Sequence, residues 1–217
     1  MKTRPFSRSQ RALTLVEVLV MVAALTLLAL CLLPALAKAK SKSGRINCVC
    51  NLKQIGLSFR IWAGDNKDRY PMRVFGTNGG TMQWVANGEV WPHFQVLSNE
   101  LSTPRVLVCP ADDHRTAAVD FTQFGNSNVS YFLSLDADET QPQMFLSGDS
   151  NLEVDGKPVG PGLLNLRTNS TPGWTADRHV RQGNICLADG SVQQLSSARL
   201  REALRFSGVA TNRLAMP

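Results

Sequence analysis

The sequence has no internal repeat and no low-complexity linker, and cysteine accounts for only 5 of its 217 residues. Glycine, at 16 residues, is far below the roughly one-third of a collagen. These features exclude a collagen and a disulfide-dense mini-protein. Hydrophobic residues make up 43% of the chain and charged residues 18%, which is typical of a folded protein and not of a disordered tail. The length corresponds to one domain, or to one domain with an anchor.

The motifs of several common enzyme classes are also missing. The chain contains no Walker-type Gly-Lys-Ser/Thr loop, no glycine-rich dinucleotide pattern and no Gly-x-Ser-x-Gly nucleophile motif. His179 and Asp189 would suit acid–base chemistry, but no nucleophile motif accompanies them, and Asp189 belongs to a predicted turn. We therefore expect a protein without enzymatic activity, in which His179 is a structural hydrogen-bonding residue.

Acidic residues are absent from residues 1–12, where four basic residues occur. Without these four charges the net charge of +6 falls to +2. The positive charge is therefore concentrated in a short basic leader and is not spread over a surface that could hold nucleic acid. We do not expect nucleic acid to be a partner.

Residues 13–37 are apolar or small apart from one charged residue, Glu17. As a helix, these 25 residues would span about 37 Å, which is enough to cross a hydrocarbon core of ~30 Å. The run is longer than the ~7–15 apolar residues of a cleaved signal peptide. A lipoprotein site at Cys31 is disfavoured because the bulky Leu30 precedes it. We expect one membrane-spanning helix, whose orientation stays open because four basic residues between positions 38 and 45 also follow it.

Glu17 lies near the N-terminal edge of this apolar run. A carboxylate in a spanning segment costs roughly a few kcal/mol, so a functional role with a partner is the default hypothesis. Two interpretations are open. Glu17 either reaches the membrane interface, or it pairs with a positive charge from another chain. A new α-amino group, exposed by proteolysis just before Leu13, would be such a charge.

Residues 11–20, RALTLVEVLV, resemble the N-terminus of type IV prepilins and type II secretion pseudopilins. The shared pattern is a basic leader, a small residue, Thr-Leu-aliphatic-Glu and a long apolar helix. The resemblance implies cleavage between Ala12 and Leu13 by a prepilin peptidase and N-methylation of Leu13; Ala12 stands where the family usually has glycine. It also implies that Glu17 neutralises the N-terminus of a neighbouring subunit during filament assembly. The implied location is the inner membrane, single-pass, with the C-terminal domain exported to the periplasm or cell exterior.

A second helical pattern occupies residues 38–64. Apolar residues recur there every three or four positions, which predicts an amphipathic helix with one buried face. This stripe consists of Ile46, Val49, Leu52, Ile55, Phe59 and Trp62. Because no strong break separates the two patterns, we expect one helix from Leu13 to Ala63, with its first half in lipid and its second half supporting a globular domain.

Residues 65–217 are rich in turn-forming residues and have short apolar runs, which predicts a β-rich globular domain. Strands are expected at residues 106–108, 129–133 and 143–146, and as a hairpin formed by residues 183–188 and 191–195 around Asp189-Gly190. A final helix, Ala198 to Phe206, would be capped by Ser196 or Ser197. The expected fold is α+β and pilin-like, with a long N-terminal α-helix packed on a C-terminal antiparallel β-sheet.

The resemblance extends into this region. The segment from Cys48 to Leu57, CVCNLKQIGL, is similar to the NLKQ-containing segment of a large bacterial pseudopilin-like group. Members of that group also carry a C-terminal histidine followed by nine residues and Asp-Gly. In this chain His179 is followed by nine residues and then by Asp189-Gly190. The similarity also covers Cys109–Asp112.

Four of the five cysteines lie beyond the apolar run. Cys48 and Cys50 are two positions apart on a predicted helix and point in different directions, so a bridge between them is disfavoured. Either of them could form a disulfide with Cys109 in an oxidising compartment. A zinc site made by these three cysteines and His179 would lack the paired spacing of structural zinc sites, so no metal site is expected. Cys186 is expected to be packed in a strand.

Two groups of acidic residues would offer oxygen ligands to calcium. They are Asp136, Asp138 and Glu139, and Asp65 and Asp68. Major pseudopilins bind calcium in a C-terminal loop, but neither group has the full spacing of a dedicated calcium loop. We expect these acids to be solvated turn residues, and we expect no cofactor.

These features predict a non-enzymatic structural subunit, or pseudopilin, of a type II secretion or type IV pilus-like filament. Its expected partners are other pilin-like subunits, prepilin peptidase, the inner-membrane assembly platform and the membrane itself. Two alternatives stay open: a membrane-anchored exported domain with a binding or enzymatic role, and a DNA-uptake pseudopilin that uses a basic C-terminus. The basic residues are Arg199, Arg201, Arg205 and Arg213, which we expect to form chiefly a solvated helix face.

Overall fold

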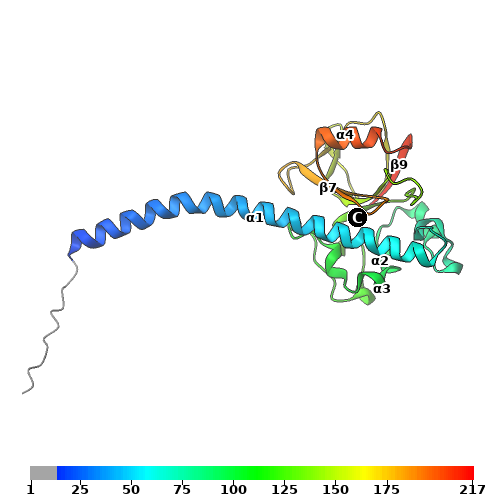
Figure 1. Ribbon diagram of the computed structural model, residues 1–217, viewed down its shortest axis with the longest axis horizontal. Helices are drawn as coiled ribbons and strands as arrows, with labels where there is room; N and C mark the ends of the chain where they lie inside the picture. Colours follow the sequence, from blue (N-terminus) through cyan, green and yellow to red (C-terminus); the bar gives the residue numbers. More distant parts are fainter. Residues whose placement is uncertain (1–13) are drawn as a thin grey trace, which may run out of the picture. The chain divides into compact units, whose positions relative to one another are not determined.

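The computed structural model of the protein describes residues 14–217, apart from the side chains of residues 34, 35 and 37–41. The chain divides into two compact units, with the boundary between Lys40 and Ser41. One helix, α1 (Leu15–Asp65), contributes residues to both units (Figure 1).

The first unit contains the apolar part of α1. Leu15–Leu33 is a 19-residue segment with a mean hydropathy of 2.7, and it is long and apolar enough to cross a membrane. All of its side chains are exposed in the single chain, which is expected of a segment that contacts lipid or other chains. The predicted N-terminal apolar helix is therefore confirmed.

In the second unit, one face of α1 lies at the centre of a hydrophobic cluster. Cys48, Leu52, Ile55 and Phe59 are fully buried, and they recur at helical spacing. Ile46, which belonged to the predicted stripe, is exposed instead. The buried face of α1 therefore begins at Cys48, two residues later than the sequence pattern indicated.

Two antiparallel sheets lie in the C-terminal part of this unit. The larger sheet has six strands in the order β5-β9-β1-β2-β7-β8, and the smaller has three in the order β4-β3-β6. The strands are β1 (Tyr131–Ser134), β2 (Phe145–Asp149), β3 (Leu152–Val154), β4 (Lys157–Pro158), β5 (Gly162–Arg167), β6 (Pro172–Trp174), β7 (Gln182–Leu187), β8 (Val192–Ser196) and β9 (Thr211–Met216).

The larger sheet separates two hydrophobic clusters. Leu133 and Cys186 belong to the cluster that contains α1. Their neighbours along the strands, Phe132 and Ile185, belong to the cluster that contains α4 (Ser197–Arg205), because successive side chains of a strand point to opposite faces. Figure 1 accordingly shows α1 and α4 on opposite sides of the sheet. The fold is α+β, with an apolar N-terminal helix and a C-terminal antiparallel sheet.

Residues 66–130 contain helical turns and loops but no strand, so the predicted β-rich domain has its strands only from Tyr131 onward. The strand predicted at residues 106–108 is wrong, because a proline-initiated 3₁₀ helix, η4 (Pro104–Leu107), is capped there by the Thr103 side chain. The other short helices are α2 (Trp91–Gln95), α3 (Ser98–Leu101) and the 3₁₀ helices η1 (Pro71–Arg73), η2 (Gly76–Asn78), η3 (Met82–Asn87), η5 (Phe121–Gln123) and η6 (Asn126–Asn128).

The C-terminal hairpin and helix lie close to their predicted positions. Strands β7 and β8 pair in antiparallel register. Their loop has three residues, Ala188–Gly190, and not two, since the Leu187 N–H donates to the Ser191 carbonyl and only Gly190 has a positive φ, of 81°. The Ser196 side chain caps the N-terminus of α4, as one of the two predicted caps.

His93 in α2 is a fully buried titratable residue. Its Nδ1 lies 2.6 Å from the Thr81 hydroxyl oxygen, and its Nε2 has no hydrogen-bond partner among the described residues. Burial lowers the pKa of His93 from 6.5 to about 4. Between these pH values the unfolded chain binds a proton on His93 that the folded chain does not, so stability falls as the pH drops through this window.

We expect His93 alone to lower the free energy of unfolding by about 2 kcal/mol between pH 7.5 and pH 5. His93→Gln keeps a polar group beside Thr81 but cannot titrate, so it should lose this part of the pH dependence. Urea unfolding of the full chain in detergent, followed by tryptophan fluorescence at both pH values, measures the difference. An equal pH dependence in the two proteins would contradict the expectation.

Candidate functional site

The predicted processing site lies outside the described residues, which begin at Thr14 and so do not include Ala12 or Leu13. Cleavage after Ala12 and methylation of Leu13 therefore stay predictions. Glu17, the predicted assembly residue, is described. It is exposed and lies in the first turn of α1.

Glu17 and Thr14 form reciprocal hydrogen bonds at the start of α1. Oε2 of Glu17 accepts hydrogen bonds from the Thr14 N–H and hydroxyl, both at 2.8 Å, and Thr14 Oγ1 accepts from the Glu17 N–H at 3.3 Å. This arrangement is a capping box. Sequence analysis missed it, although Thr-x-x-Glu is its signature. Both contacts to the carboxylate use Oε2, and none of the ion pairs of the described residues includes Glu17, so Oε1 is available to a cation.

A disulfide joins Cys48 of α1 to Cys109, which follows η4, with a Cα–Cα distance of 5.4 Å. Of the two candidates on α1, Cys48 therefore makes the bridge, because it lies on the buried face of the helix. Cys50 is exposed and has a free thiol, as does Cys31. The thiol of Cys186 is also free but buried, and burial raises its pKa to about 12.

His179 and Asp149 lie beside this disulfide, and we call these four residues the disulfide–histidine cluster. His179 Nε2 is 3.4 Å from Cys109 Sγ and 3.7 Å from Asp149 Oδ2. Asp149 Oδ2 also accepts hydrogen bonds from the backbone and side-chain N–H groups of Asn184, both at 2.8 Å. The other oxygen, Oδ1, is buried without a hydrogen-bond partner in the described part of the chain.

Burial shifts the pKa of both titratable groups in the cluster in the direction that disfavours the charged form. It raises the pKa of Asp149 to about 6, against the opposing effects of Arg178 and of the Asn184 hydrogen bonds. Burial, followed by the charges of Arg178 and Arg45, lowers the pKa of His179 to about 4. At neutral pH, Asp149 is therefore mostly ionised and His179 is neutral. Their 3.7 Å contact is not an ion pair.

Two arginines surround the cluster. Arg45 of α1 donates to the side-chain oxygen of Asn184 at 3.4 Å. Arg178 donates to the Ser130 carbonyl at 3.0 Å and pairs with Asp112 at 3.1 Å. Sequence analysis did not place Arg45, Arg178 or Asn184 near His179. Apart from Arg178, which precedes His179 directly, they come from segments far apart in the chain, and no local pattern links them.

The backbone at His179 is strained. His179, Val180 and Arg181 have φ values of 53°, 53° and 56° and form a left-handed turn. This conformation costs roughly 1–2 kcal/mol per L-residue, and it is least favourable for a β-branched residue such as Val180. The His179 side chain is buried at the cluster while Val180 is 74% exposed, so the turn directs the imidazole inward just before β7. Strain of this kind persists only where the surroundings hold it.

The two ends of the His-x₉-Asp-Gly pattern do not meet. His179 contacts the disulfide of Cys48. The Asp189-Gly190 turn instead lies near the end of α1, where the Asp189 carbonyl accepts from Arg60 at 3.0 Å. A Cβ on Gly56 would lie 3.2 Å from Gly190 Cα. The nine intervening residues mostly form β7, which runs along α1, so the pattern describes two anchoring points of one strand.

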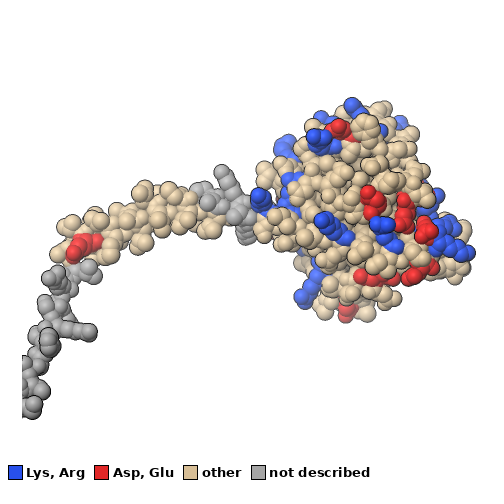
Figure 2. All heavy atoms as spheres, viewed as in Figure 1, with Lys and Arg blue, Asp and Glu red and all other residues tan. Residues whose placement is uncertain are grey.

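Three of the five acidic residues considered as calcium ligands face arginines instead. Asp136 pairs with Arg213, Asp138 with Arg73 at 2.9 Å, and Glu139 with Arg60 at 3.1 Å. Figure 2 shows acidic and basic side chains interspersed on this view of the globular domain. Among the described residues, neither acidic group places three ligands together. Asp136, Asp138 and Glu139 are thus each part of a surface ion pair, whereas the ion pairs of the described residues include neither Asp65 nor Asp68.

The sequence suggested that the basic residues of the C-terminus form one helix face. The structure divides them between two elements. Arg199, Arg201 and Arg205 lie in α4, but Arg213 lies in β9. Two of the four are already paired, Arg199 with Glu202 at 3.2 Å and Arg213 with Asp136. Arg201 and Arg205 are in none of the ion pairs of the described residues.

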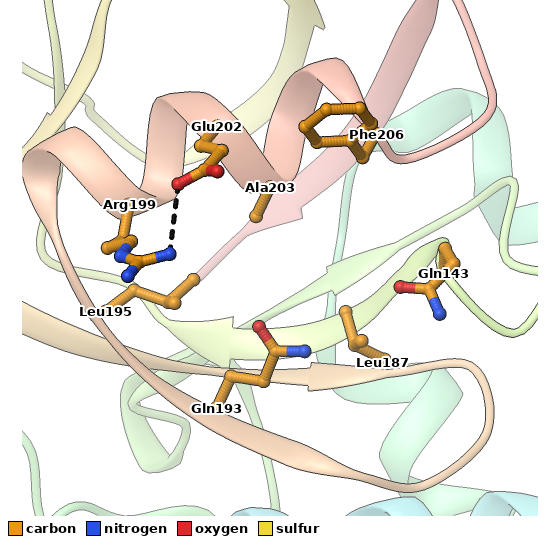
Figure 3. Close-up of a pocket in the computed structure, with 8 residues that line it drawn as sticks. All are labelled: Gln143, Leu187, Gln193, Leu195, Arg199, Glu202, Ala203 and Phe206. Atoms are coloured by element: carbon orange, nitrogen blue, oxygen red, sulfur yellow. Dashed lines mark hydrogen bonds and ion pairs between the residues drawn. The ribbon is translucent and has the colours of Figure 1, made fainter.

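A small pocket of about 200 Å³ lies between α4 and β8 (Figure 3). The Arg199–Glu202 ion pair occupies one side of it and Phe206, which is 71% exposed, the other. Small-molecule sites usually enclose about 300–1,000 Å³ and present convergent polar groups. This pocket is smaller than that range, and two of its four polar side chains, Arg199 and Glu202, are paired with each other, so we assign no role to it.

Comparison of the chain with the models of protein families, with curated proteins and with solved structures gives no match. The geometry of the described residues leaves two candidate sites, the N-terminal turn around Glu17 and the disulfide–histidine cluster.

Proposed function

We propose that this protein is a pseudopilin-like structural subunit of a type II secretion or type IV pilus-like filament. The observation that carries the proposal is the segment Leu15–Leu33, which is apolar, exposed along its whole length and interrupted by one acid, Glu17, near its N-terminal end. An acid at such a position is costly in lipid unless a partner is supplied. The capping box leaves Oε1 of Glu17 available for that partner.

In this proposal the apolar helices of neighbouring subunits pack side by side, first in the membrane and then in the filament. Cleavage after Ala12 creates a positively charged amino group on Leu13, and Glu17 of an adjacent subunit pairs with it. A pair of this kind sets the register between subunits more than it adds net stability, since both charges lose their water. The sheet domain carries no catalytic role in this mechanism.

The Cys48–Cys109 disulfide supports an exported location for the second unit, because disulfides persist in oxidising compartments such as the periplasm. The proposed protein is thus a single-pass protein of the inner membrane with its sheet domain exported. Its proposed partners are prepilin peptidase, the assembly platform of the inner membrane and other pilin-like subunits.

Processing provides the direct test. In cells with an active prepilin peptidase, the membrane-extracted chain should begin at N-methylated Leu13, as read by N-terminal sequencing and intact-protein mass spectrometry. Ala12→Leu places a larger side chain in the peptidase site and should slow cleavage more than tenfold. This change corresponds to about 1.4 kcal/mol in the activation free energy. Ala12→Gly, which restores the family's usual residue, is the matched control and should be cleaved at least as well as the wild-type chain. Retention of Met1 by the wild-type chain in such cells would refute the proposal.

A further inference from the structure

Four potential metal ligands lie together in the interior of the second unit. One ligand atom from each of Cys48, Cys109, Asp149 and His179 lies within 4.8 Å of all the others, and all four residues are buried. The ligands of a tetrahedral zinc ion, with bonds of ~2.0–2.3 Å, are about 3.3–3.8 Å apart. The distances of 3.4 Å between Cys109 Sγ and His179 Nε2, and of 3.7 Å between His179 Nε2 and Asp149 Oδ2, already fit this spacing.

We propose that the dithiol form of this chain binds one zinc ion through Cys48, Cys109, Asp149 and His179. A dithiol or phosphine reductant supplies two electrons, and with two protons the S–S bond is replaced by two thiols. Zinc then displaces both thiol protons and binds the two thiolates. The sulfur atoms, bonded in the oxidised chain, must separate to roughly 3.7 Å, which side-chain rotation on either side can provide.

The surroundings of the cluster suit a zinc ion. Asp149 is fully buried, and its Oδ1 has no hydrogen-bond partner in the described structure, a deficiency that a metal bond through Oδ1 as well as Oδ2 would relieve. The Asn184 hydrogen bonds fix the orientation of that carboxylate. Two thiolates and one carboxylate would leave a net charge of −1 around the ion, and Arg45 and Arg178 supply positive charge beside Asp149.

Zinc and the disulfide would make the same connection, between α1 and the segment that follows η4. The metal would hold this connection in a reduced chain, and the disulfide would hold it after oxidation. The ligand set differs from the one considered in the sequence, which contained Cys50. Cys50 is exposed and lies outside the cluster, and Asp149 takes its place. This inference does not depend on a role in filaments.

The test compares the zinc content of the two redox forms of the full chain in detergent. Protein reduced with a phosphine under anaerobic conditions is mixed with zinc chloride, desalted and analysed by elemental mass spectrometry. We expect one zinc per reduced chain and none in the disulfide form. Cobalt(II) added to the reduced chain should give sulfur-to-cobalt charge-transfer bands and the strong visible absorption of tetrahedral coordination.

Ligand variants test the assignment of the site. Asp149→Asn and His179→Gln each remove one ligand and should lower zinc affinity by at least about tenfold. Both variants keep the two bridging cysteines, so formation of the disulfide on oxidation shows that they still fold. The readout is the set of thiols left free, which are Cys31, Cys50 and Cys186. Cys50→Ser is the matched control and should bind zinc as the wild-type chain does.

Several outcomes would overturn the proposal. One is a reduced, folded wild-type chain that retains no more zinc than the disulfide form. Another is unchanged affinity in both ligand variants, or a loss of zinc in Cys50→Ser, since either would place the ion elsewhere. If a ligand variant does not re-form the disulfide, the wild-type cobalt spectrum decides, and a spectrum without thiolate bands would reject the site.

Discussion

Glu17→Gln should abolish incorporation of the chain into filaments while leaving it membrane-inserted and cleaved after Ala12. In the proposed filament, the amide would leave the amino group of a neighbouring Leu13 buried without a countercharge. Removing one partner of a buried ion pair costs about 3–5 kcal/mol, which corresponds to a loss of more than about 100-fold. The measurement is an immunoblot of the sheared filament fraction and of the membrane fraction, from cells that contain the assembly machinery.

The capping box requires controls that separate a local role of Glu17 from an intermolecular one. Glu17→Gln keeps an oxygen that can accept from Thr14, so it removes the charge and retains much of the cap. Thr14→Ala does the reverse and should cost only about 1 kcal/mol of helix stability. Thr26→Ala removes a hydroxyl that bonds only the Ala23 carbonyl of its own helix, and it should assemble normally. Normal assembly of Glu17→Gln would show that Glu17 is merely a helix cap.

Loss of the Cys48–Cys109 disulfide is expected to destabilise the second unit by about 4 kcal/mol. The bridge closes a loop with a sequence separation of 61 residues, and the chain-entropy relation for a loop of this size gives about 4 kcal/mol. For a unit of this length, the loss corresponds to a fall in melting temperature of roughly 8–16 °C. The double variant Cys48→Ala with Cys109→Ala avoids leaving a single buried thiol. Circular dichroism of the full chain in detergent, without added metal, follows the transition.

Cys50→Ala is the matched control for this prediction, because Cys50 lies on the same helix but is exposed and unbridged. It should melt with the wild-type chain under non-reducing conditions. Reduction of the wild-type chain in a metal chelator should bring its melting temperature close to that of the double variant. Equal melting of the double variant and the oxidised wild-type chain would show that the bridge does not contribute to stability.

The features that sequence analysis predicted are those set by local patterns. The apolar run and the stripe of Leu52, Ile55 and Phe59 predicted one long helix, and α1 ends at Asp65, two residues after the predicted end. The Asp-Gly turn between β7 and β8 and the serine cap of α4 were also visible, because turn and cap preferences depend on a few adjacent residues.

Strands that depend on distant partners were missed. β9 (Thr211–Met216) lies between β1 and β5 in the larger sheet, yet its sequence, TNRLAM, has a single β-branched residue and no clear alternation. Its extended conformation is stabilised by pairing on both sides. At residues 106–108 a strand was predicted where none forms. These apolar residues lie mostly in a short helix that Pro104 and Thr103 initiate.

By itself, the sequence of this protein determined a basic N-terminal stretch, an apolar helix with one acid, and an amphipathic continuation, because charge and periodicity can be read within a few turns of one segment. Only the tertiary structure decided that Cys48 and not Cys50 bridges Cys109, and that Asp149 and His179 lie beside that bridge. These residues come from α1, from the segment after η4, from β2 and from the turn before β7. Their proximity follows from the packing of α1 on the sheet, which no spacing along the chain encodes.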